Sequence, residues 1–175
     1  TPSGNIPKEI GLLTNLIRLN LNNRWGNTKF TGEIPTEICN LTNLVYLNLS
    51  YNELTGSIPP EIGHLTNLLF LLISRNEING EIPSTIGNLV DLRSLLFSFN
   101  NLSGTIPQEI GNLTKLHVLD MHYNELTGPL PSNIGNLQNL GVWHPEYYNP
   151  NFDTDFWPAL DFSHNQLTGP LPASI

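Results

Sequence analysis

The sequence predicts an α/β repeat solenoid, with short parallel β-strands on one side and irregular or 3₁₀ turns on the other. A Gly-x-Ile/Leu-Pro signature occurs seven times, and most copies are 24 residues apart. Each repeat contains a short run in which apolar residues alternate with other residues, which is typical of a strand. An asparagine recurs at one place after each run. Self-similarity at such a period indicates a solenoid, in which each repeat packs against its neighbours.

The repeat unit is clearest from Leu44 to Asn67, and three further copies follow directly after it. Two gaps between successive signatures exceed the period, by 4 and by 17 residues. We interpret residues 1–175 as a single array of about seven units that is partial at both ends. A short insertion lies at 22–31 and a second, aromatic-rich insertion at 141–159. Insertions on a repeat scaffold are places where specificity is often added.

The elements of one unit follow in a fixed order. The strand run, such as Leu116-x-x-Leu119-x-Met121, is too short to be stable alone, so it must pair in parallel with the equivalent strand of the next unit. Glycine permits the turn that follows, and proline ends any helix. The Glu-Ile-Gly-Asn-Leu segment supplies two core residues over about one turn, which predicts a 3₁₀ or irregular element. An asparagine recurs between the strand and the turn of each unit, and its side-chain amide can form hydrogen bonds with backbone groups of adjacent coils. These asparagines are Asn52, Asn76, Asn100, Asn124 and Asn165.

This pattern resembles the plant-specific class of leucine-rich repeats, whose units carry Leu-Thr-Gly-x-Ile-Pro. The resemblance covers almost the whole chain except residues 22–31 and 141–159. It implies a leucine-rich repeat superhelix with a parallel β-sheet on the concave face and irregular or 3₁₀ turns on the convex face. Members of this class form the ectodomains of receptor kinases and of receptor-like proteins, and other members are polygalacturonase inhibitors. The resemblance therefore also implies an extracellular or cell-surface location. The family's cysteine-paired terminal caps are missing from the sequence. We therefore expect either a fragment of a longer protein or ends that dock against something else.

Composition and charge argue against several classes of function. The formal net charge is −8, with 15 acidic and 7 basic residues, and a nucleic-acid partner would need a cationic surface. No apolar run approaches the ~18 residues of a membrane span. The sequence has no nucleophile elbow, no glycine-rich phosphate loop and no Cys/His cluster, so we predict neither an enzyme nor a cofactor. Cys39, the single cysteine, stands where other repeats have glycine, and we interpret it as a small core residue rather than a reactive thiol.

The residues that point outward from the predicted concave sheet carry the main functional prediction. Core leucines point inward, and the residues between them form outward columns at the repeat period. Several outward residues are apolar or aromatic although the core does not need them, and we expect them to be exposed and contiguous. Exposed aromatic residues beside an arginine are typical of an interface, whereas the alternative is a face that tolerates apolar residues or is covered by a larger chain. The predicted ligand-binding residues are Tyr46, Tyr51, Phe70, Leu72, Arg75, Leu96, Phe99 and Tyr123.

The insertion at 141–159 holds six of the 15 aromatic residues of the chain. If it folds over the concave face, Trp143 and Trp157 would wall one end of the ligand site. By resemblance, it is analogous to the island insertions that help form the ligand site of some plant receptors. The alternative is a self-packed Ω-loop whose aromatic residues cover its own strand.

Two further groups of residues are candidate sites. Carboxylate and imidazole side chains gather on neighbouring predicted strands, where they could bind a metal ion or form a pH-responsive contact; these residues are Asp120, His122, Asp161 and His164. The alternative is an ordinary solvated polar edge, and no ligand-spacing motif supports a metal. Asn-x-Ser/Thr sequons predict N-glycosylation at Asn40, Asn48, Asn101 and Asn112.

We therefore expect an extracellular recognition module that binds a protein or peptide on its concave face. A structural protein that self-associates through its solenoid ends is the main alternative. The resemblance to polygalacturonase inhibitors implies another alternative function, inhibition of a secreted glycosidase. Ice binding is a further alternative, because hydroxyl residues recur at the repeat period, interrupted by Asn79; they are Thr31, Thr55, Ser103, Thr127 and Thr168.

Overall fold

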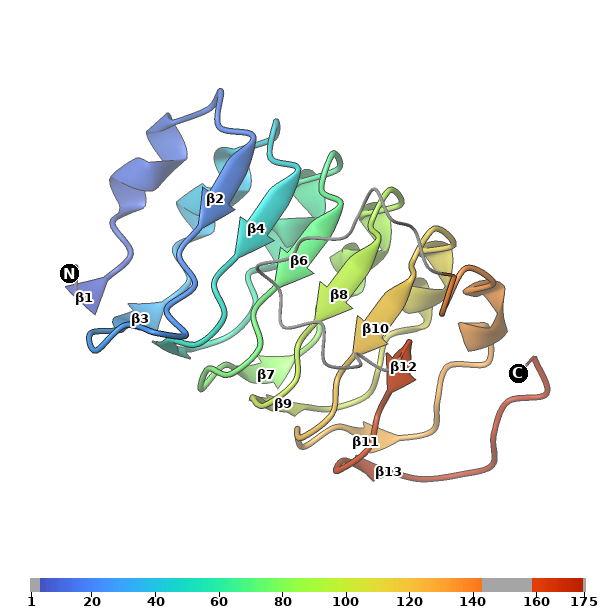
Figure 1. The fold of residues 1–175 in the computed structure, drawn as a ribbon. Helices are drawn as coiled ribbons and strands as arrows, with labels where there is room; N and C mark the ends of the chain where they lie inside the picture. The colour runs from blue at the N-terminus through green and yellow to red at the C-terminus, as the bar shows by residue number, and fades with distance from the viewer. Residues whose placement is uncertain (1–3, 143–158, 175) are drawn as a thin grey trace.

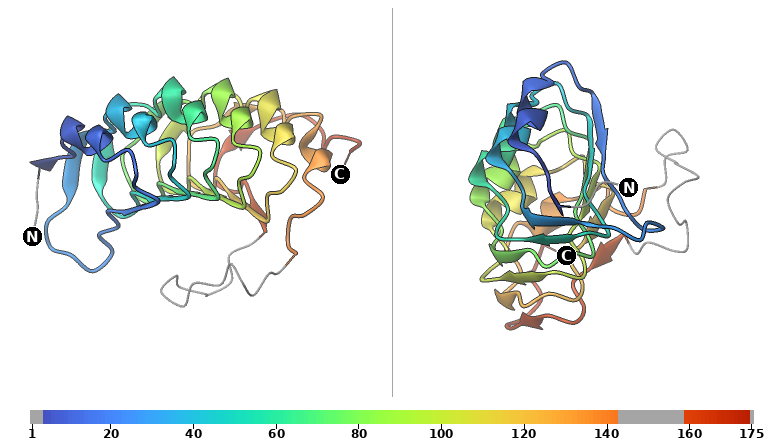
Figure 2. Two further views of the ribbon diagram at one scale, coloured as in Figure 1. Left: turned by 90° about the horizontal axis from the view of Figure 1, so that it is seen from above. Right: turned by 90° about the vertical axis from the view of Figure 1, so that its left-hand side faces the viewer.

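The computed structural model describes residues 4–142 and 159–174, which form a curved stack of coils (Figure 1). Each coil passes from a strand on one side, through a turn and a second short strand, to a 3₁₀ helix on the opposite side. Figure 2 shows the 3₁₀ helices along the outer side of the curve and the strands of one parallel sheet along its inner side. The predicted solenoid with a parallel concave sheet is therefore confirmed. Within the described ranges no helix is long and apolar enough to cross a membrane.

The inner side of the curve is a parallel sheet, which we call the large sheet. Its strands are arranged in the order β12-β10-β8-β6-β4-β2, so each neighbour comes from the adjacent repeat. Residues pair at the repeat spacing, as Leu71 does with Leu95 and Leu95 with Leu119. Leu119 in turn pairs with Leu160, so the strands on either side of the longer gap are direct neighbours. The strands are β2 (Arg18–Asn20), β4 (Tyr46–Asn48), β6 (Phe70–Leu72), β8 (Ser94–Leu96), β10 (Val118–Asp120) and β12 (Leu160–Asp161).

The outer side of the curve carries one short 3₁₀ helix per coil. In most coils a proline in extended conformation precedes the helix, for example Pro83 with φ −67° and ψ 138°. The apolar residue of each helix points into the core, and the next residue packs against the following coil. A Cβ atom on Gly63 would lie 2.6 Å from the Thr85 carbonyl oxygen of that coil, so only glycine fits there without a shift. The helices are η1 (Lys8–Leu12), η2 (Thr36–Asn40), η3 (Pro60–His64), η4 (Ser84–Asn88), η5 (Gln108–Asn112) and η6 (Ile134–Asn136).

Further parallel strands follow the turn after the large sheet and form small sheets along the side of the array. Their register differs from that of the large sheet. Asn79 pairs with Asn101 and Ser57 with Asn79, a spacing of 22 residues rather than 24. Residues at equivalent repeat positions are therefore displaced by two residues per coil on this side. The strands are β1 (Gly4–Asn5), β3 (Phe30–Glu33), β5 (Glu53–Thr55), β7 (Asn79–Glu81), β9 (Asn101–Ser103), β11 (Thr127–Gly128) and β13 (Gln166–Leu167).

The main hydrophobic core runs along the array between the large sheet and the 3₁₀ helices. Leu47, Leu71, Leu95 and Leu119 are at most 1% exposed, which confirms the predicted inward positions. Cys39 is also buried, and its position in the core agrees with the interpretation of a small core residue. Burial, assisted by the nearby Glu61 carboxylate, raises the pKa of the Cys39 thiol to about 12.

The recurring asparagines join adjacent coils, as the sequence predicts. The Asn100 side-chain amide donates to the Phe97 carbonyl oxygen at 3.0 Å and to the Ile73 carbonyl oxygen of the preceding coil at 3.1 Å. Its Oδ1 accepts a hydrogen bond from the Ile78 backbone N–H at 3.1 Å. These bonds satisfy buried backbone groups at the bend, where the sheet ends and cannot satisfy them. The same arrangement recurs at Asn52, Asn76, Asn124 and Asn165.

Candidate functional site

The large sheet presents the predicted columns in the predicted register, but its middle is buried on both faces. Tyr46, Leu72 and Leu96 are 3%, 2% and 6% exposed, so the expectation that they form an exposed patch is wrong. They pack against one another across β4, β6 and β8, and the half-buried Phe70 and Val118 pack against them. We call these five residues the inner-face cluster. Alternation along a strand predicts which face a side chain lies on, but it does not predict whether that face is open to water.

Polar contacts hold Tyr46 at one end of the inner-face cluster. The Arg18 guanidinium lies 4.3 Å from the centre of the Tyr46 ring. The Asn48 side-chain amide donates to the Tyr46 hydroxyl at 3.1 Å, and Asn48 Oδ1 accepts from the Ser50 backbone N–H at 3.0 Å. Burial raises the pKa of the Tyr46 hydroxyl, while the hydrogen bond from Asn48 and the charge of Arg18 act in the opposite direction.

The same contacts contradict the predicted glycosylation of Asn48. Its side chain is 4% exposed, and the nitrogen that would carry a glycan donates to Tyr46. A glycan on this nitrogen would have no room in the folded chain. The other three sequon asparagines, Asn40, Asn101 and Asn112, are exposed, and their glycosylation remains a prediction.

A second group of predicted residues forms a continuous stack across the coils. Each of these residues lies just after the C-terminal end of a different strand of the large sheet. The Arg75 guanidinium lies 3.9 Å from the centre of the Phe99 ring and 5.4 Å from that of Tyr51. Phe99 stacks on Tyr123 with a centroid distance of 4.7 Å and an interplanar angle of 13°. Tyr123 stacks on His164 at 3.9 Å and 6°. We call Tyr51, Arg75, Phe99, Tyr123 and His164 the stacked column.

Every residue of the stacked column has a left-handed backbone, with φ between 52° and 60°. This conformation is unfavourable for bulky residues by ~1–2 kcal/mol each, so the surrounding structure must impose it. The asparagine that follows each of them supplies the hydrogen bonds that fix the bend. Tyr123 is 45% exposed, Arg75 and His164 are exposed, and Tyr51 and Phe99 are half-buried. The stacked column is thus the open part of the predicted ligand surface.

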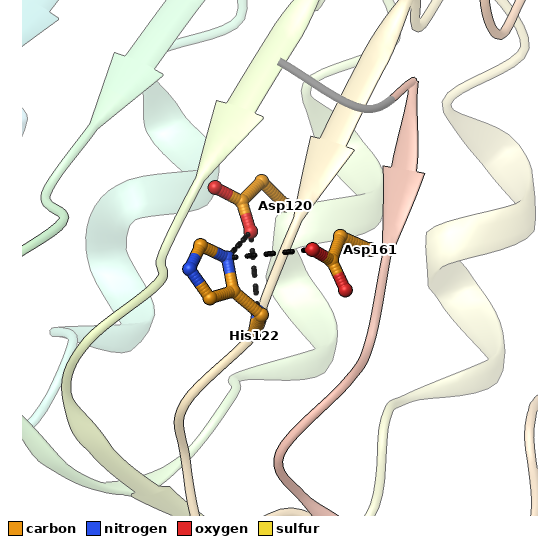
Figure 3. Close-up of side chains that lie close together, drawn as sticks. All are labelled: Asp120, His122 and Asp161. Carbon is orange, nitrogen blue, oxygen red and sulfur yellow. Dashed lines mark hydrogen bonds and ion pairs between the residues drawn. The ribbon is translucent and has the colours of Figure 1, made fainter. Parts of the chain in front are cut away.

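The structure also brings together three of the four residues that the sequence suggests for a metal site (Figure 3). His122 Nδ1 lies 2.5 Å from Asp120 Oδ1 and 3.8 Å from Asp161 Oδ2. His164 is not part of this group, because its ring stacks on Tyr123 instead. Partial burial alone would raise the pKa of Asp161, but hydrogen bonds from Ser163 and the nearby imidazoles of His122 and His164 outweigh it and lower that pKa.

The insertions differ in what the structure describes. Trp143 and Trp157 lie outside the described residues, so their predicted place beside the ligand site stays a prediction. In the shorter insertion, Trp25 is 87% exposed. The Arg24 guanidinium lies 4.8 Å from its ring and 5.5 Å from the Tyr51 ring, and so connects it to the end of the stacked column. Nothing in the repeat pattern predicts this position of Arg24, because the residue belongs to the insertion.

The hydroxyl residues considered for ice binding lie on the side sheets. Because pairing there is shifted by two residues per coil, Thr55 is aligned with Glu33 and not with Thr31. The hydroxyl residues of successive coils are therefore not directly paired but are offset by two residues from one coil to the next. The exposed residues that pair directly across coils are Ser57, Asn79 and Asn101.

Comparison with solved structures finds several plant ectodomains with this architecture. The ectodomain of the receptor kinase GASSHO1/SCHENGEN3 from Arabidopsis thaliana, solved with CASPARIAN STRIP INTEGRITY FACTOR 2, is 41% identical over 98% of this chain, with a TM-score of 0.84. The Arabidopsis receptor kinase HAESA, solved with the peptide hormone IDA and the co-receptor SERK1, is 33% identical over 98% of this chain, with a TM-score of 0.76. The present chain spans 18% and 26% of their lengths.

A plant ice-binding protein is also similar, with 32% identity over 76% of this chain and 42% of its own length, and a TM-score of 0.68. No curated protein sequence matches the chain. The model of the Leucine Rich Repeat family matches residues 43–65, 67–89, 91–113, 115–137 and 159–175, and it indicates no catalytic family. Together with the large sheet, the asparagine bonds and the 3₁₀ helices, these matches show that the chain belongs to the leucine-rich repeat family.

Proposed function

We propose that the chain is part of an extracellular recognition module that binds a peptide or protein along the stacked column. The single observation that carries this proposal is the exposed stack of aromatic and cationic side chains at the edge of the large sheet. Two similar ectodomains were solved in complexes, one with CASPARIAN STRIP INTEGRITY FACTOR 2 and one with the peptide hormone IDA and the co-receptor SERK1, which supports a peptide or protein ligand. The same comparison supports an extracellular or cell-surface location.

The stacked column has the properties of a prepared contact surface. Stacking and the fixed backbone hold its rings in place, so binding would lose little side-chain entropy. Aromatic residues and arginine are also the types that most often dominate binding energy at interfaces. Phe70 is one of the two half-buried members of the inner-face cluster and could extend the surface toward the middle of the sheet.

The proposal can be tested by selecting binders from a phage-displayed peptide library on the isolated chain. The selected peptides, together with synthetic CASPARIAN STRIP INTEGRITY FACTOR 2 and IDA, are then titrated calorimetrically into variants. Phe99→Ala combined with Tyr123→Ala should weaken the best binder at least tenfold, since each truncation at an interface centre costs ~2 kcal/mol. Glu109→Ala on the outer side is the matched control, because Glu109 is exposed and distant from the large sheet. Equal affinity in the double variant and the control would refute the proposal.

Self-association is the main rival, and light scattering of the same proteins separates the two. A peptide-binding module should remain one size at all concentrations. A mass that rises with concentration and falls in the Phe99→Ala/Tyr123→Ala variant would mean that the stacked column binds another copy of the chain.

Ice binding is a second candidate, favoured by the similarity to a plant ice-binding protein. If the side sheets bind ice, the directly paired row of Ser57, Asn79 and Asn101 is the surface to test. Asn79→Tyr should then abolish inhibition of ice recrystallisation, whereas Glu109→Tyr should preserve it. No inhibition by the unmodified chain would remove this candidate.

A further inference from the structure

We propose that Asp120, His122 and Asp161 form a binding site for a divalent transition-metal ion of the zinc type. The proposal does not depend on peptide binding at the stacked column. One candidate donor atom from each residue lies within 4.8 Å of the other two. The three side chains point toward a common space at the edge of the large sheet (Figure 3).

The register of the large sheet creates this cluster. Asp120 ends β10, Asp161 ends β12, and the two residues are direct partners in the parallel pairing. Side chains at partner positions of adjacent strands lie on the same face, ~4.8 Å apart. His122 comes two residues after Asp120, so it lies on the same face of the chain. The insertion between the strands leaves this pairing intact, so residues 41 positions apart meet reliably.

The spacing of the donor atoms suits a small metal ion. Tetrahedral zinc sites with bonds of ~2.0–2.2 Å place neighbouring donor atoms ~3.3–3.5 Å apart. The observed separations from His122 Nδ1 are 2.5 Å to Asp120 and 3.8 Å to Asp161, which lie on either side of that value. Shifts of about 1 Å in side-chain position would bring all three atoms to bonding distance.

The surroundings fix the ligands in position. Asp120 is 1% exposed, and its Oδ1 accepts the His122 backbone N–H at 3.2 Å. Asp161 Oδ1 accepts the Ser163 backbone N–H at 2.8 Å. The His122 ring makes an edge contact with Phe99, with centroids 4.7 Å apart. Two carboxylates facing each other at partner positions also repel, and a cation between them would remove that repulsion.

The donor set selects the class of metal. Two carboxylates and one imidazole suit Zn²⁺, Co²⁺, Ni²⁺ or Cu²⁺, whereas Ca²⁺ and Mg²⁺ require a fuller shell of oxygen ligands. Three protein ligands leave a fourth position for water or for a group of a bound partner. Because His122 also contacts Phe99 and Tyr123 of the stacked column, a metal here would lie next to the proposed recognition surface.

The test uses the full chain without an affinity tag, titrated with ZnCl₂ by calorimetry and with CoCl₂ by visible absorption. We expect one saturable Zn²⁺ site per chain, the d–d bands of bound Co²⁺, and no comparable heat with CaCl₂. His122→Gln and Asp161→Asn, both at partly exposed positions, should each weaken Zn²⁺ binding at least tenfold. Asp120→Asn should do the same, and circular dichroism will establish that each variant is folded.

His64→Gln is the matched control, since His64 is an exposed histidine at the end of η3 and on the opposite side of the array. The absence of saturable Zn²⁺ binding would overturn the proposal. So would full binding in folded His122→Gln and Asp161→Asn, or an equal loss in His64→Gln. Peptide binding by the isolated chain does not enter this readout, so the two proposals can fail separately.

Discussion

The neighbouring residues Leu95 and Leu96 test how the two faces of the large sheet contribute to stability. Leu95 is fully buried in the main core, whereas Leu96 belongs to the inner-face cluster and is 6% exposed. Truncation of Leu95 to alanine removes about three carbon groups, worth ~2.4 kcal/mol of transfer free energy. A residual cavity of ~60 Å³ would add ~1.5 kcal/mol, because the core on either side is held by neighbouring coils.

We therefore expect Leu95→Ala to lower the free energy of unfolding by ~4 kcal/mol. Leu96→Ala should lower it by ~2 kcal/mol, since its cluster is small and includes the half-buried Phe70 and Val118, which can move into the gap. The sequence alone predicts that Leu96→Ala costs much less than Leu95→Ala, because it predicts an exposed side chain at Leu96. The burial of Leu96 changes that expectation.

The assay is urea unfolding followed by circular dichroism, with Val90→Ala as a control at a residue that is 49% exposed. The control should change the unfolding free energy by less than ~0.5 kcal/mol. If Leu96→Ala proved as damaging as Leu95→Ala, the assignment of the two faces of β8 would be refuted, since a one-residue shift in register exchanges them.

Three further predictions address the bends and the core. Asn100→Ala should lower the free energy of unfolding by ~2–3 kcal/mol, because it leaves buried backbone groups without partners. Asn101→Ala should change that free energy by less than ~0.5 kcal/mol. Equal midpoints of the two variants in thermal melts would contradict the role assigned to Asn100. Arg75→Val should destabilise the chain by ~1–2 kcal/mol more than Arg75→Asn, because a β-branched residue is poorly compatible with φ 58°, and chemical denaturation of both variants measures the difference. Cys39 should not react with a thiol reagent at pH 8 in the folded chain, because its raised pKa leaves only ~10⁻⁴ of the thiol ionised, but it should react in urea. Because the pKa of the thiol is raised by folding, its contribution to the free energy of unfolding is present at neutral pH. That contribution is lost as the pH rises from about 9 toward about 12. Rapid labelling without urea would show that the thiol is accessible.

The sequence predicts the architecture well because the repeat pattern determines both period and face. The spacing of the leucines predicts which residues of each strand point into the core, and Leu71, Leu95 and Leu119 all lie there. The position of the asparagines predicts their bonds between coils, since an amide at a bend must serve backbone groups that the sheet leaves unpaired. Repetition supplies the same evidence several times over, which a single strand or turn would not.

The candidate site is less predictable, because the environment of an outward side chain depends on neighbours from other coils. Tyr46 and Leu96 point outward as predicted, yet both are buried. His164 lies in the predicted column and has the same left-handed backbone, but its ring stacks on Tyr123 and is not part of the cluster of Asp120, His122 and Asp161. A pattern of residue types carries no signal for this backbone conformation in bulky residues. The pairing of β10 with β12 across the longer insertion confirms that Asp120 and Asp161 lie on neighbouring strands, as the repeat register predicts.

The difference in register between the two kinds of sheet affects how this array can evolve. Repeat proteins lengthen by duplication of whole units, and each new unit places every residue one period after its parent. On the large sheet, where pairing follows the period, duplication extends each column of side chains in a straight line. On the side sheets each copied residue is displaced by two positions, or ~6.6 Å, relative to its parent. Duplication alone can therefore extend the aligned columns of the inner face, whereas a straight row on the side requires separate substitutions in every coil.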